Sequence, residues 1–393
     1  MDLRLKFPSA GKTLLEGLRS ARNFVDPRRP GYLIVYVTNR CNFACDFCFY
    51  HAEIRKGVRP DELSVKEFER IARSVGGLLQ LSLTGGEPFV RLDFADVANV
   101  WLQHTSPHYV TIPTNGWFTD RIVDTLERIL PAFPNSSFRL MLSIDGIGGA
   151  HDEARSAPGS YDRLVRTFNK VAALRSKHGN LVLDANTVLT ERTRTGILDT
   201  LRHLDTSFDF DNLSVTCARG GLKDPGMKTR AAEEYMGARS FLVGRARRRE
   251  NRSLSSVWRA IDDVTYDRYI STVFDDKFVG PCVAGSKLAV LRETGEVFPC
   301  EILGPTVGNV RDFAYDLPAV LAGEANRRML QRIRSSRCRC GFECALAANL
   351  VWNVGSYPKL ARAAIRNLIG TRSRKNLDTM QGPPANPPSS ERS

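Results

Sequence analysis

The feature that most constrains this chain is a regular alternation of short apolar runs and amphipathic stretches between residues 32 and 250. The runs are rich in β-branched and aromatic residues, and the stretches repeat their apolar residues at helical spacing. The predicted strands are Tyr32–Thr38, Leu79–Leu83, Tyr109–Ile112, Phe138–Ile144, Leu181–Val188 and Leu213–Thr216. The predicted helices are Ser64–Val75 (with Ser64 as N-cap), Phe94–Gln103, Asp120–Leu130, Tyr161–Ser176, Thr195–Leu204 and Met227–Arg249.

Six strand–helix repeats predict an α/β fold with a parallel sheet and helical crossovers. Six repeats are too few to close an eight-fold barrel, but they are enough for an open, partial (β/α)6 barrel of the TIM type. In such folds the chemistry lies at the carboxyl ends of the strands. Motifs that directly follow a strand are therefore the first candidates for a site.

Composition narrows the class of protein further. Apolar residues make up 42% of the sequence, which suits a globular core. There is no apolar run of about 18 residues, and the opening MDLRLKF lacks the apolar segment of a signal peptide. We therefore expect a cytoplasmic, reducing location, where nine cysteines indicate metal binding rather than disulfides.

The first group of cysteines is Cys41, Cys45 and Cys48, which begins three residues after the first predicted strand. Three thiolates on a short loop can hold three irons of a [4Fe–4S] cubane and leave the fourth iron open to a ligand. Zinc is the alternative, because His51 could complete a set of four ligands.

The segment from Cys41 to Cys48, CNFACDFC, resembles the signature loop of the radical S-adenosylmethionine (SAM) superfamily, including the aromatic residue before the last cysteine. The resemblance extends over the alternating region, roughly residues 32–250. It implies that the open iron binds SAM and that one-electron reduction cleaves SAM to methionine and a 5′-deoxyadenosyl radical. That radical abstracts hydrogen from a substrate. An electron donor such as flavodoxin or ferredoxin is then expected.

Two further motifs follow the second and third strands. Gly85, Gly86 and Glu87 resemble the GGE motif of the same superfamily, which binds the methionine amine, and glycines permit close backbone approach to a ligand. Asn115 precedes a glycine after the third strand, where it is either a turn residue or part of the cofactor site.

The later strands supply the remaining candidate cofactor contacts. By resemblance, Ser143 and Asp145 would meet the ribose or carboxylate side of SAM, although Asp before Gly is also an ordinary turn former. Asn186 and Arg219 match places where relatives contact the cofactor, and Arg219 could clamp a carboxylate. Cys217 ends the sixth strand; a buried free cysteine is usually packing, and the alternative is a hydrogen donor to a substrate radical.

Five more cysteines lie between residues 282 and 344. Cys282 and Cys300 flank a predicted hairpin, in a pattern that resembles the SPASM/twitch extensions of radical SAM enzymes, which carry auxiliary [4Fe–4S] clusters. Five cysteines can fully ligate only one cluster, which favours the shorter twitch-like form. The expected ligands are Cys282, Cys300, Cys344 and Cys340, with Cys338 as the alternative to Cys340. A structural zinc site is the competing interpretation.

The predicted organisation has five parts. They are a basic N-terminal extension (1–30), the radical SAM partial barrel (31–250), a SPASM/twitch-like domain (251–350), a basic amphipathic helix (351–381) and a disordered Pro/Ser-rich tail (382–393).

The formal net charge of +13 has two concentrated sources, around residues 245–252 and 359–375. Neither cluster is interleaved with the aromatic residues of a single-strand-binding surface, so no specific nucleic-acid partner is expected. Solvated helix faces explain the charge, and the alternative is a charged partner such as an anionic membrane surface.

These features together predict a radical SAM enzyme that abstracts hydrogen from a peptide or small-molecule substrate. An auxiliary cluster suits the removal of an electron, so we expect an oxidoreductase with a net oxidation. One alternative is a radical epimerase that uses Cys217 as hydrogen donor. A different class, a non-catalytic iron–sulfur electron carrier, leaves the GGE motif unexplained.

Overall fold

The computed structural model describes residues 23, 26, 28–249 and 255–380. The predicted disordered tail and nearly all of the predicted N-terminal extension lie outside these residues. Within them, every strand and helix predicted for the alternating region is present, with ends shifted by a few residues.

The six predicted strands form a parallel sheet in sequence order, as expected for a partial barrel. They are β1 (Tyr32–Thr38), β2 (Gln80–Gly85), β3 (Tyr109–Thr114), β4 (Ser137–Ser143), β5 (Leu181–Leu189) and β6 (Asn212–Cys217). Parallel neighbours need long crossovers, which the helices provide. All seven residues of β1 are buried, because this strand has neighbours on both edges and is covered on both faces.

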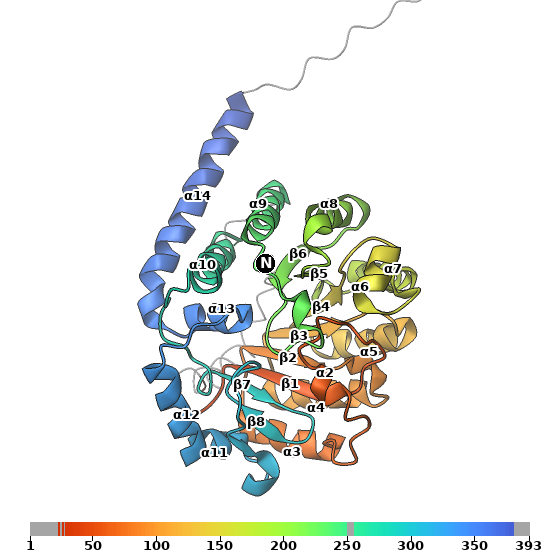
Figure 1. The fold of residues 1–393 in the computed structure, drawn as a ribbon, viewed down its shortest axis with the longest axis vertical. Coiled ribbons are helices and arrows are strands. Elements are labelled where there is room, and N and C mark those ends of the chain that lie inside the picture. The colour runs from red at the N-terminus through yellow and green to blue at the C-terminus, as the bar shows by residue number, and fades with distance from the viewer. Residues whose placement is uncertain (1–22, 24–25, 27, 250–254, 381–393) are drawn as a thin grey trace, which may run out of the picture.

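Helices surround the outer face of this sheet (Figure 1). They are α3 (Val65–Val75), α4 (Phe94–Thr105), α5 (Thr119–Ala132), α7 (Ser160–Lys177), α8 (Ile197–Ser207) and α9 (Ala232–Arg249), with the short α2 (His51–Ile54) and α6 (Gly149–Arg155) between them. Ser64 caps α3 as predicted, in a reciprocal capping box with Glu67. Phe68 of α3 and Trp101 of α4 pack edge to face, with ring centroids 6.3 Å apart, in the core under the sheet.

The C-terminal hairpin extends the barrel sheet. Its first strand, β7 (Leu288–Leu291), pairs parallel with β1, and β8 (Glu296–Phe298) and β9 (Gly308–Asn309) continue the sheet antiparallel. The order of the nine strands is β6-β5-β4-β3-β2-β1-β7-β8-β9. The hairpin was expected in a separate domain beginning at residue 251. Its fully buried first strand instead completes the open edge of β1.

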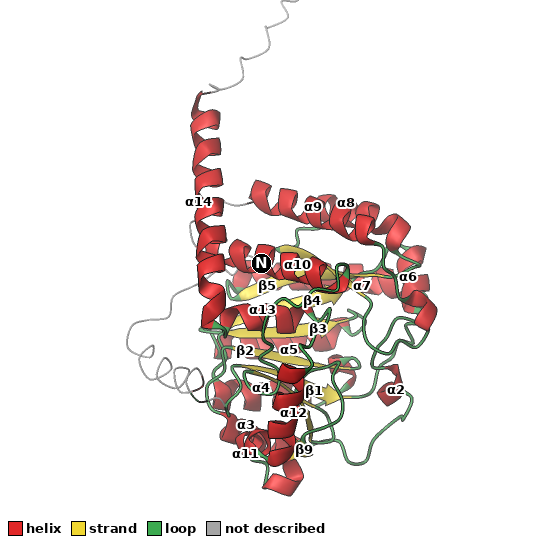
Figure 2. Ribbon diagram, turned by 60° about the vertical axis from the view of Figure 1, so that its left-hand side comes forward, coloured by secondary structure: helices red, strands yellow, loops and turns green. Residues whose placement is uncertain are grey.

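The remaining C-terminal chain is helical (Figure 2). It contains α10 (Ser255–Val273), α11 (Leu317–Ala322), α12 (Glu324–Ser335), α13 (Glu343–Val351) and α14 (Tyr357–Met380). Sequence reasoning missed α10. A small apolar cluster that includes Val264, Leu350 and Ala363 joins α10, α13 and α14, and the far end of α14 extends beyond the body in both ribbon views. No helix among the described residues combines the length and apolarity of a membrane span.

The first arginine cluster is not simply a solvated helix face. Arg245 of α9 is 4% exposed, and its Nε donates to Asp205 at 2.7 Å while Nη2 donates to the Phe210 carbonyl. This guanidinium therefore joins α9 to α8 and to the start of β6. Of the second cluster, Lys359, Arg362 and Arg366 on α14 are exposed.

Candidate functional site

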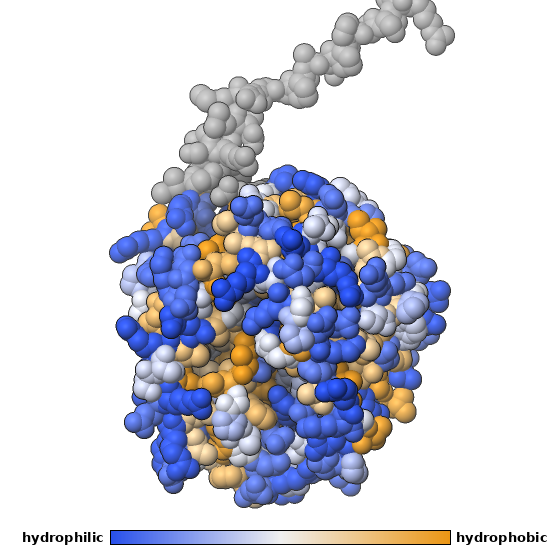
Figure 3. Space-filling view, viewed as in Figure 1, coloured by the Kyte–Doolittle hydropathy of each residue, from blue (hydrophilic) through white to orange (hydrophobic). Residues whose placement is uncertain are grey.

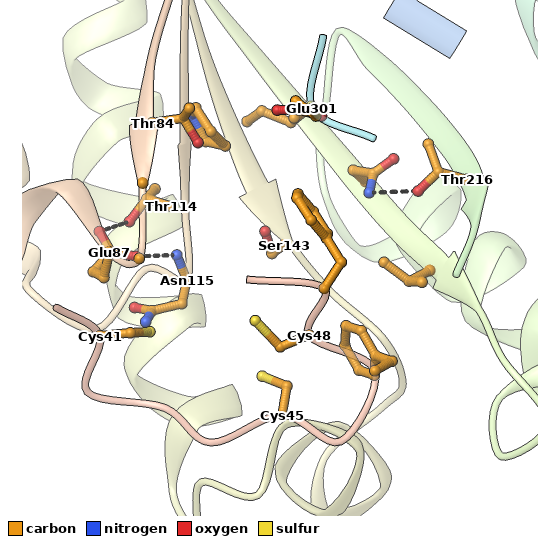
Figure 4. A pocket seen from close by; sticks show the side chains of 18 of the residues that line it. Cys41, Cys45, Cys48, Thr84, Glu87, Thr114, Asn115, Ser143, Thr216 and Glu301 are labelled. Carbon is orange, nitrogen blue, oxygen red and sulfur yellow. Dashed lines mark hydrogen bonds between the residues drawn. The ribbon is translucent and has the colours of Figure 1, made fainter. Parts of the chain in front are cut away.

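A cavity of about 450 Å³ lies inside the partial barrel (Figure 4). Alternate residues of the strands face it, as strand geometry requires; Arg139, Met141 and Ser143 of β4 are one such series. The cavity also reaches the loops after the strands, where the sequence motifs lie. Figure 3 shows a hollow in the middle of the face seen in Figure 1, with apolar residues around it.

Cys41, Cys45 and Cys48 all line this cavity, on the loop that follows β1. In Figure 4 the side chains of Cys45 and Cys48 point in the same direction, and Cys41 lies across from them. Burial raises the pKa of Cys41 to about 12 and that of Cys45 to about 11. His51, the possible fourth zinc ligand, also lines the cavity, and its Nδ1 lies 3.0 Å from the Cys48 carbonyl oxygen.

Arg155 of α6 is a residue of this site that sequence reasoning missed. Its guanidinium is buried, lines the cavity and lowers the pKa of Cys45 and Cys48 against the effect of burial. Asp145 holds it through contacts of 2.6 Å to Nε and Nη2. Asp145 itself does not line the cavity. Its other carboxylate oxygen accepts a hydrogen bond from the Val188 N–H at 2.6 Å, so both oxygens are used within the protein. No motif in the sequence contains Arg155.

Gly85 and Gly86 lie where the chain leaving β2 passes close to the start of the cysteine loop. A Cβ on Gly85 would lie 2.2 Å from the Thr38 carbonyl oxygen, and one on Gly86 2.2 Å from that of Arg40. Gly85 also has φ +141°, a conformation that side chains disfavour. The Gly86 N–H donates to the Thr38 carbonyl at 2.9 Å, so this approach connects the two loops.

Glu87 is 2% exposed and its carboxylate is fully engaged. It accepts from Thr114 Oγ1 at 2.8 Å, from the Asn115 N–H at 2.7 Å and from the Phe89 N–H at 3.2 Å. Burial raises the pKa of Glu87 to about 7 in spite of these hydrogen bonds. Asn115 in turn donates from Nδ2 to Asn42 in the cysteine loop at 2.9 Å. Glu87 and Asn115 therefore hold the ends of β2 and β3 against the cysteine loop, and both line the cavity.

Two other candidates, Ser143 and Asn186, line the cavity from β4 and β5. Asn186 is oriented by two hydrogen bonds: its Nδ2 donates to Thr216 at 3.2 Å, and its Oδ1 accepts from Ser214 at 2.9 Å. The amide is therefore fixed by β6 before any ligand binds.

Arg219 lines the cavity as well, and two carboxylates occupy its terminal nitrogens. Nη2 lies 3.1 Å from Glu301, and Nη1 lies 3.1 Å from Glu343. Glu301 also accepts from the Tyr36 hydroxyl at 2.8 Å and faces the cavity, whereas sequence reasoning gave it no role. Its position directly after Cys300 was the one available signal.

Cys217 faces the same cavity at the end of β6, with 6% of its surface exposed. Burial raises the pKa of its thiol to about 12, and Tyr269 of α10 hydrogen-bonds to it. The thiol is thus protonated and held next to the cavity.

The C-terminal cysteines divide into a group of four and a separate residue. Cys282 and Cys338 raise the pKa of Cys300, and Cys338 hydrogen-bonds to Cys340, so these four thiols lie near one another. Cys344, an expected ligand, instead lines the barrel cavity, where it hydrogen-bonds to Tyr32 and is influenced by Glu301 and Arg219. The structure therefore brings Cys338 to the group and leaves Cys344 in the barrel.

Among the described residues, no three His, Cys, Asp or Glu side chains converge in the way that one ion requires.

Comparisons with known proteins agree with this geometry. Residues 35–204 match the family model described as the radical SAM superfamily. SuiB of Streptococcus suis, at 16% identity, superimposes with a TM-score of 0.55 over 82% of this chain and 73% of its own. A structure of anSMEcpe with bound AdoMet, also at 16% identity, gives a TM-score of 0.54 over 87% and 99%. At these identities the likeness shows the fold alone.

Similar curated sequences include GTP 3′,8-cyclases. That of Actinobacillus pleuropneumoniae serotype 5b is 34% identical over 99 residues, which are 25% of this chain and 29% of the relative. That of Synechococcus elongatus is 27% identical over 161 residues, or 40% and 46%. The chain thus spans less than half the length of these relatives.

The open parallel barrel with a three-cysteine loop at its strand ends defines a radical SAM fold. The matched part of the chain, residues 35–204, is a radical SAM domain, and members of that superfamily use a [4Fe–4S] cluster and SAM. The predicted superfamily, fold class and pair of cofactors are thereby confirmed.

Proposed function

We propose that this chain is a radical SAM enzyme that removes a hydrogen atom from a polar substrate bound in the barrel cavity, with a net oxidation as the outcome. The observation that carries the proposal is that the cysteine loop and a second, polar set of side chains share one cavity. When bound, the cluster and SAM supply a 5′-deoxyadenosyl radical. The protein contributes orientation and the exclusion of water.

The cofactor side of the cavity is the rim formed by the strand ends. Cys41, Cys45 and Cys48 would hold the cluster. We expect six residues at this rim to lie next to SAM: Gly85, Gly86, Glu87, Asn115, Ser143 and Asn186. Asp145 acts from behind them by holding Arg155 against the cysteine loop.

The substrate side lies deeper in the barrel and is polar. The buried Nη2 of Arg139 and Nε of Arg219 have no hydrogen-bond partner among the described residues, and unpaired buried donors are costly. With Glu301 they offer both signs of charge to a substrate. We infer a substrate group that carries hydrogen-bond acceptors, from a small molecule or from one side chain of a peptide.

A peptide substrate has specific support. SuiB has been solved bound to the precursor peptide SuiA, and anSMEcpe with the Cp18Cys peptide. A cavity of about 450 Å³ that must also admit SAM leaves room for a side chain rather than a whole peptide. The remainder of such a peptide would lie outside the barrel.

We further propose that Cys282, Cys300, Cys338 and Cys340 hold an auxiliary [4Fe–4S] cluster in a twitch-like extension. Four thiolates ligate a cubane completely, so this cluster would serve electron transfer rather than SAM binding. An electron left on the substrate after hydrogen abstraction then has an acceptor near the cavity, which supports a net oxidation. The electron donor for SAM cleavage is expected to be flavodoxin or ferredoxin.

Anaerobic reconstitution tests the proposal. The protein is loaded with iron and sulfide, reduced with dithionite and assayed for 5′-deoxyadenosine from SAM. We expect formation of this product, and a further rise with the correct substrate. A cluster-loaded protein that makes none would contradict the proposal and favour a non-catalytic electron carrier.

A radical epimerase is the second candidate, because Cys217 presents a protonated thiol at the cavity. In that reaction the thiol would give a hydrogen atom to the substrate radical. The thiyl radical left on Cys217 would regain an electron from the external donor and a proton from solvent, so product made in deuterated water carries deuterium. Cys217→Ala would abolish the product while 5′-deoxyadenosine continues to form. Cys344→Ala is the matched control, since its thiol lines the same cavity. Undiminished product from Cys217→Ala rules out the epimerase.

A further inference from the structure

A second cavity of about 450 Å³ lies between α10 and α14, and it is lined mainly by cations. From α10 come Val264, Asp267, Arg268 and Ser271, and from α14 come Lys359, Arg362, Ala363 and Arg366. Each set has the spacing i, i+3, i+4, i+7, so each is one face of its helix. The segment Lys277–Val279 closes one side of the space.

The charges around this cavity are not balanced. Five side chains are cationic and only Asp267 is acidic. Lys359, Arg362 and Arg366 have no hydrogen bond or ion pair with any residue in the described part of the chain. Like charges around one cavity repel each other, and a bound anion would remove that repulsion.

Arg268 is the most enclosed of these cations. It is partly buried, and its Nη2 donates to the hydroxyl of Ser356, directly before α14, at 3.0 Å. A guanidinium has five N–H donors, so one bond to Ser356 leaves the others available. Lys277 is exposed and pairs with Asp275 at 3.1 Å, so it contributes less.

One large apolar side chain borders the cavity. On α14 the exposed Ile365 and Leu368 lie outside the i, i+3, i+4, i+7 set that lines the cavity, so they point away from it. Phe278, at the other side of the cavity, is 39% exposed. An exposed phenyl ring beside a cationic cavity suits a ligand with an anionic head and an apolar part.

We propose that this cavity is a binding site for a phosphate-bearing ligand, separate from the radical SAM cavity. Guanidinium groups bind phosphate oxygens through paired, charge-assisted hydrogen bonds. A space of this size admits one or two phosphate groups between the helices rather than a flat polyanion. The phosphate belongs either to a soluble compound or to the headgroup of an anionic lipid.

Calorimetry with inorganic diphosphate on the full-length, cluster-loaded protein tests the site. We expect saturable binding, weakened about tenfold for each cation removed in Arg362→Gln/Arg366→Gln. Both residues are exposed, so folding is not at risk. The matched control is Arg166→Gln/Lys177→Gln, which removes the same charge from the exposed face of α7. Binding that is absent, or that weakens equally in the control, overturns the proposal.

Vesicles distinguish the two sources of phosphate. Sedimentation is compared for vesicles of phosphatidylcholine alone and for vesicles with an equal part of phosphatidylglycerol. A lipid headgroup predicts binding to the anionic vesicles only, reduced in Phe278→Ser while diphosphate binding is retained. Diphosphate binding without any preference for the anionic vesicles assigns the site to a soluble ligand. If anionic vesicles bind the protein equally well after Arg362→Gln/Arg366→Gln, the cavity is not their site.

Discussion

The two groups of cysteines differ in how the chain brings them together. Cys41, Cys45 and Cys48 lie on one loop between β1 and α2. The second group comes from separate segments, with Cys282 before β7, Cys300 after β8, and Cys338 and Cys340 before α13. The first group is therefore a local structure, whereas the second exists only after the hairpin has joined β1 and α13 has packed.

This difference explains why the first set of ligands could be inferred from spacing and the second could not. Three thiols within eight residues after a strand leave few alternatives. In the second region Cys338, Cys340 and Cys344 lie within seven residues of one another. Which of them joins Cys282 and Cys300 depends on the direction in which the chain turns into α13. The turn directs Cys344 toward Tyr32 and the barrel.

The largest effect should come from the first group. In Cys45→Ser we expect 5′-deoxyadenosine formation to fall to background, because the cluster that binds SAM loses one of its three ligands. The iron content should fall to about four atoms per chain, the number that the second group of cysteines would hold. The measurements are product by chromatography and iron by colorimetry. The matched control, Cys217→Ser, changes another buried thiol of the cavity and should keep all its iron.

The next effect separates the candidates in the second group. Cys338→Ala should lose about four irons per chain, while Cys344→Ala should keep them, because only Cys338 lies with the other three thiols. Iron and acid-labile sulfide measure the difference. The reverse result, with loss only in Cys344→Ala, would restore the ligand set expected from the sequence and contradict the division seen in the structure.

Much of the fold was accessible from the sequence because its signals are local. Apolar periodicity and caps such as Ser64 define the six strand–helix units, and a parallel sheet follows from their alternation. The motifs after β2 to β6 were predicted at the rim, and the structure places Glu87, Asn115 and Asn186 on one cavity. Their roles toward SAM stay predictions.

The rest depends on contacts between distant segments. The pairing of β7 with β1 joins residues more than 250 positions apart, and four apolar residues in a row carry no information about their partner. Arg155 and Glu301 reach the cavity from a short helix and a loop that contain no motif. Asp145 shows the converse, because its position at a strand end predicted a cofactor contact and its carboxylate is instead used by Arg155.

Glycines near the two groups should differ in how much they tolerate a side chain. Gly85→Ala places a Cβ 2.2 Å from a backbone oxygen at φ +141°, and we expect roughly 3–5 kcal/mol of destabilisation. Gly341→Ala is the comparison in the second region, where the nearest atom is a Val273 side-chain methyl at 2.9 Å. A methyl can move, so a loss near 1 kcal/mol is expected. Anaerobic urea denaturation measures both, and equal losses would contradict the rigidity assigned to the first loop.

The smallest effect concerns the buried glutamates that adjoin the two regions. Burial raises the pKa of both Glu87 and Glu343 to about 7, from a usual value of 4.5. Each carboxyl therefore binds its proton more tightly in the folded state than in the unfolded state. The stability gained in this way is complete below pH 4.5 and is lost as the pH rises through about 7, at no more than about 1.4 kcal/mol per pH unit for each group.

Urea denaturation between pH 5.5 and 7.5 should show this fall in stability, and Glu87→Gln and Glu343→Gln should each reduce the slope of stability against pH. Glu127→Gln, an exposed carboxyl on α5, is the control. Equal slopes in the wild-type protein and in Glu87→Gln and Glu343→Gln would contradict the raised pKa of these two carboxyls.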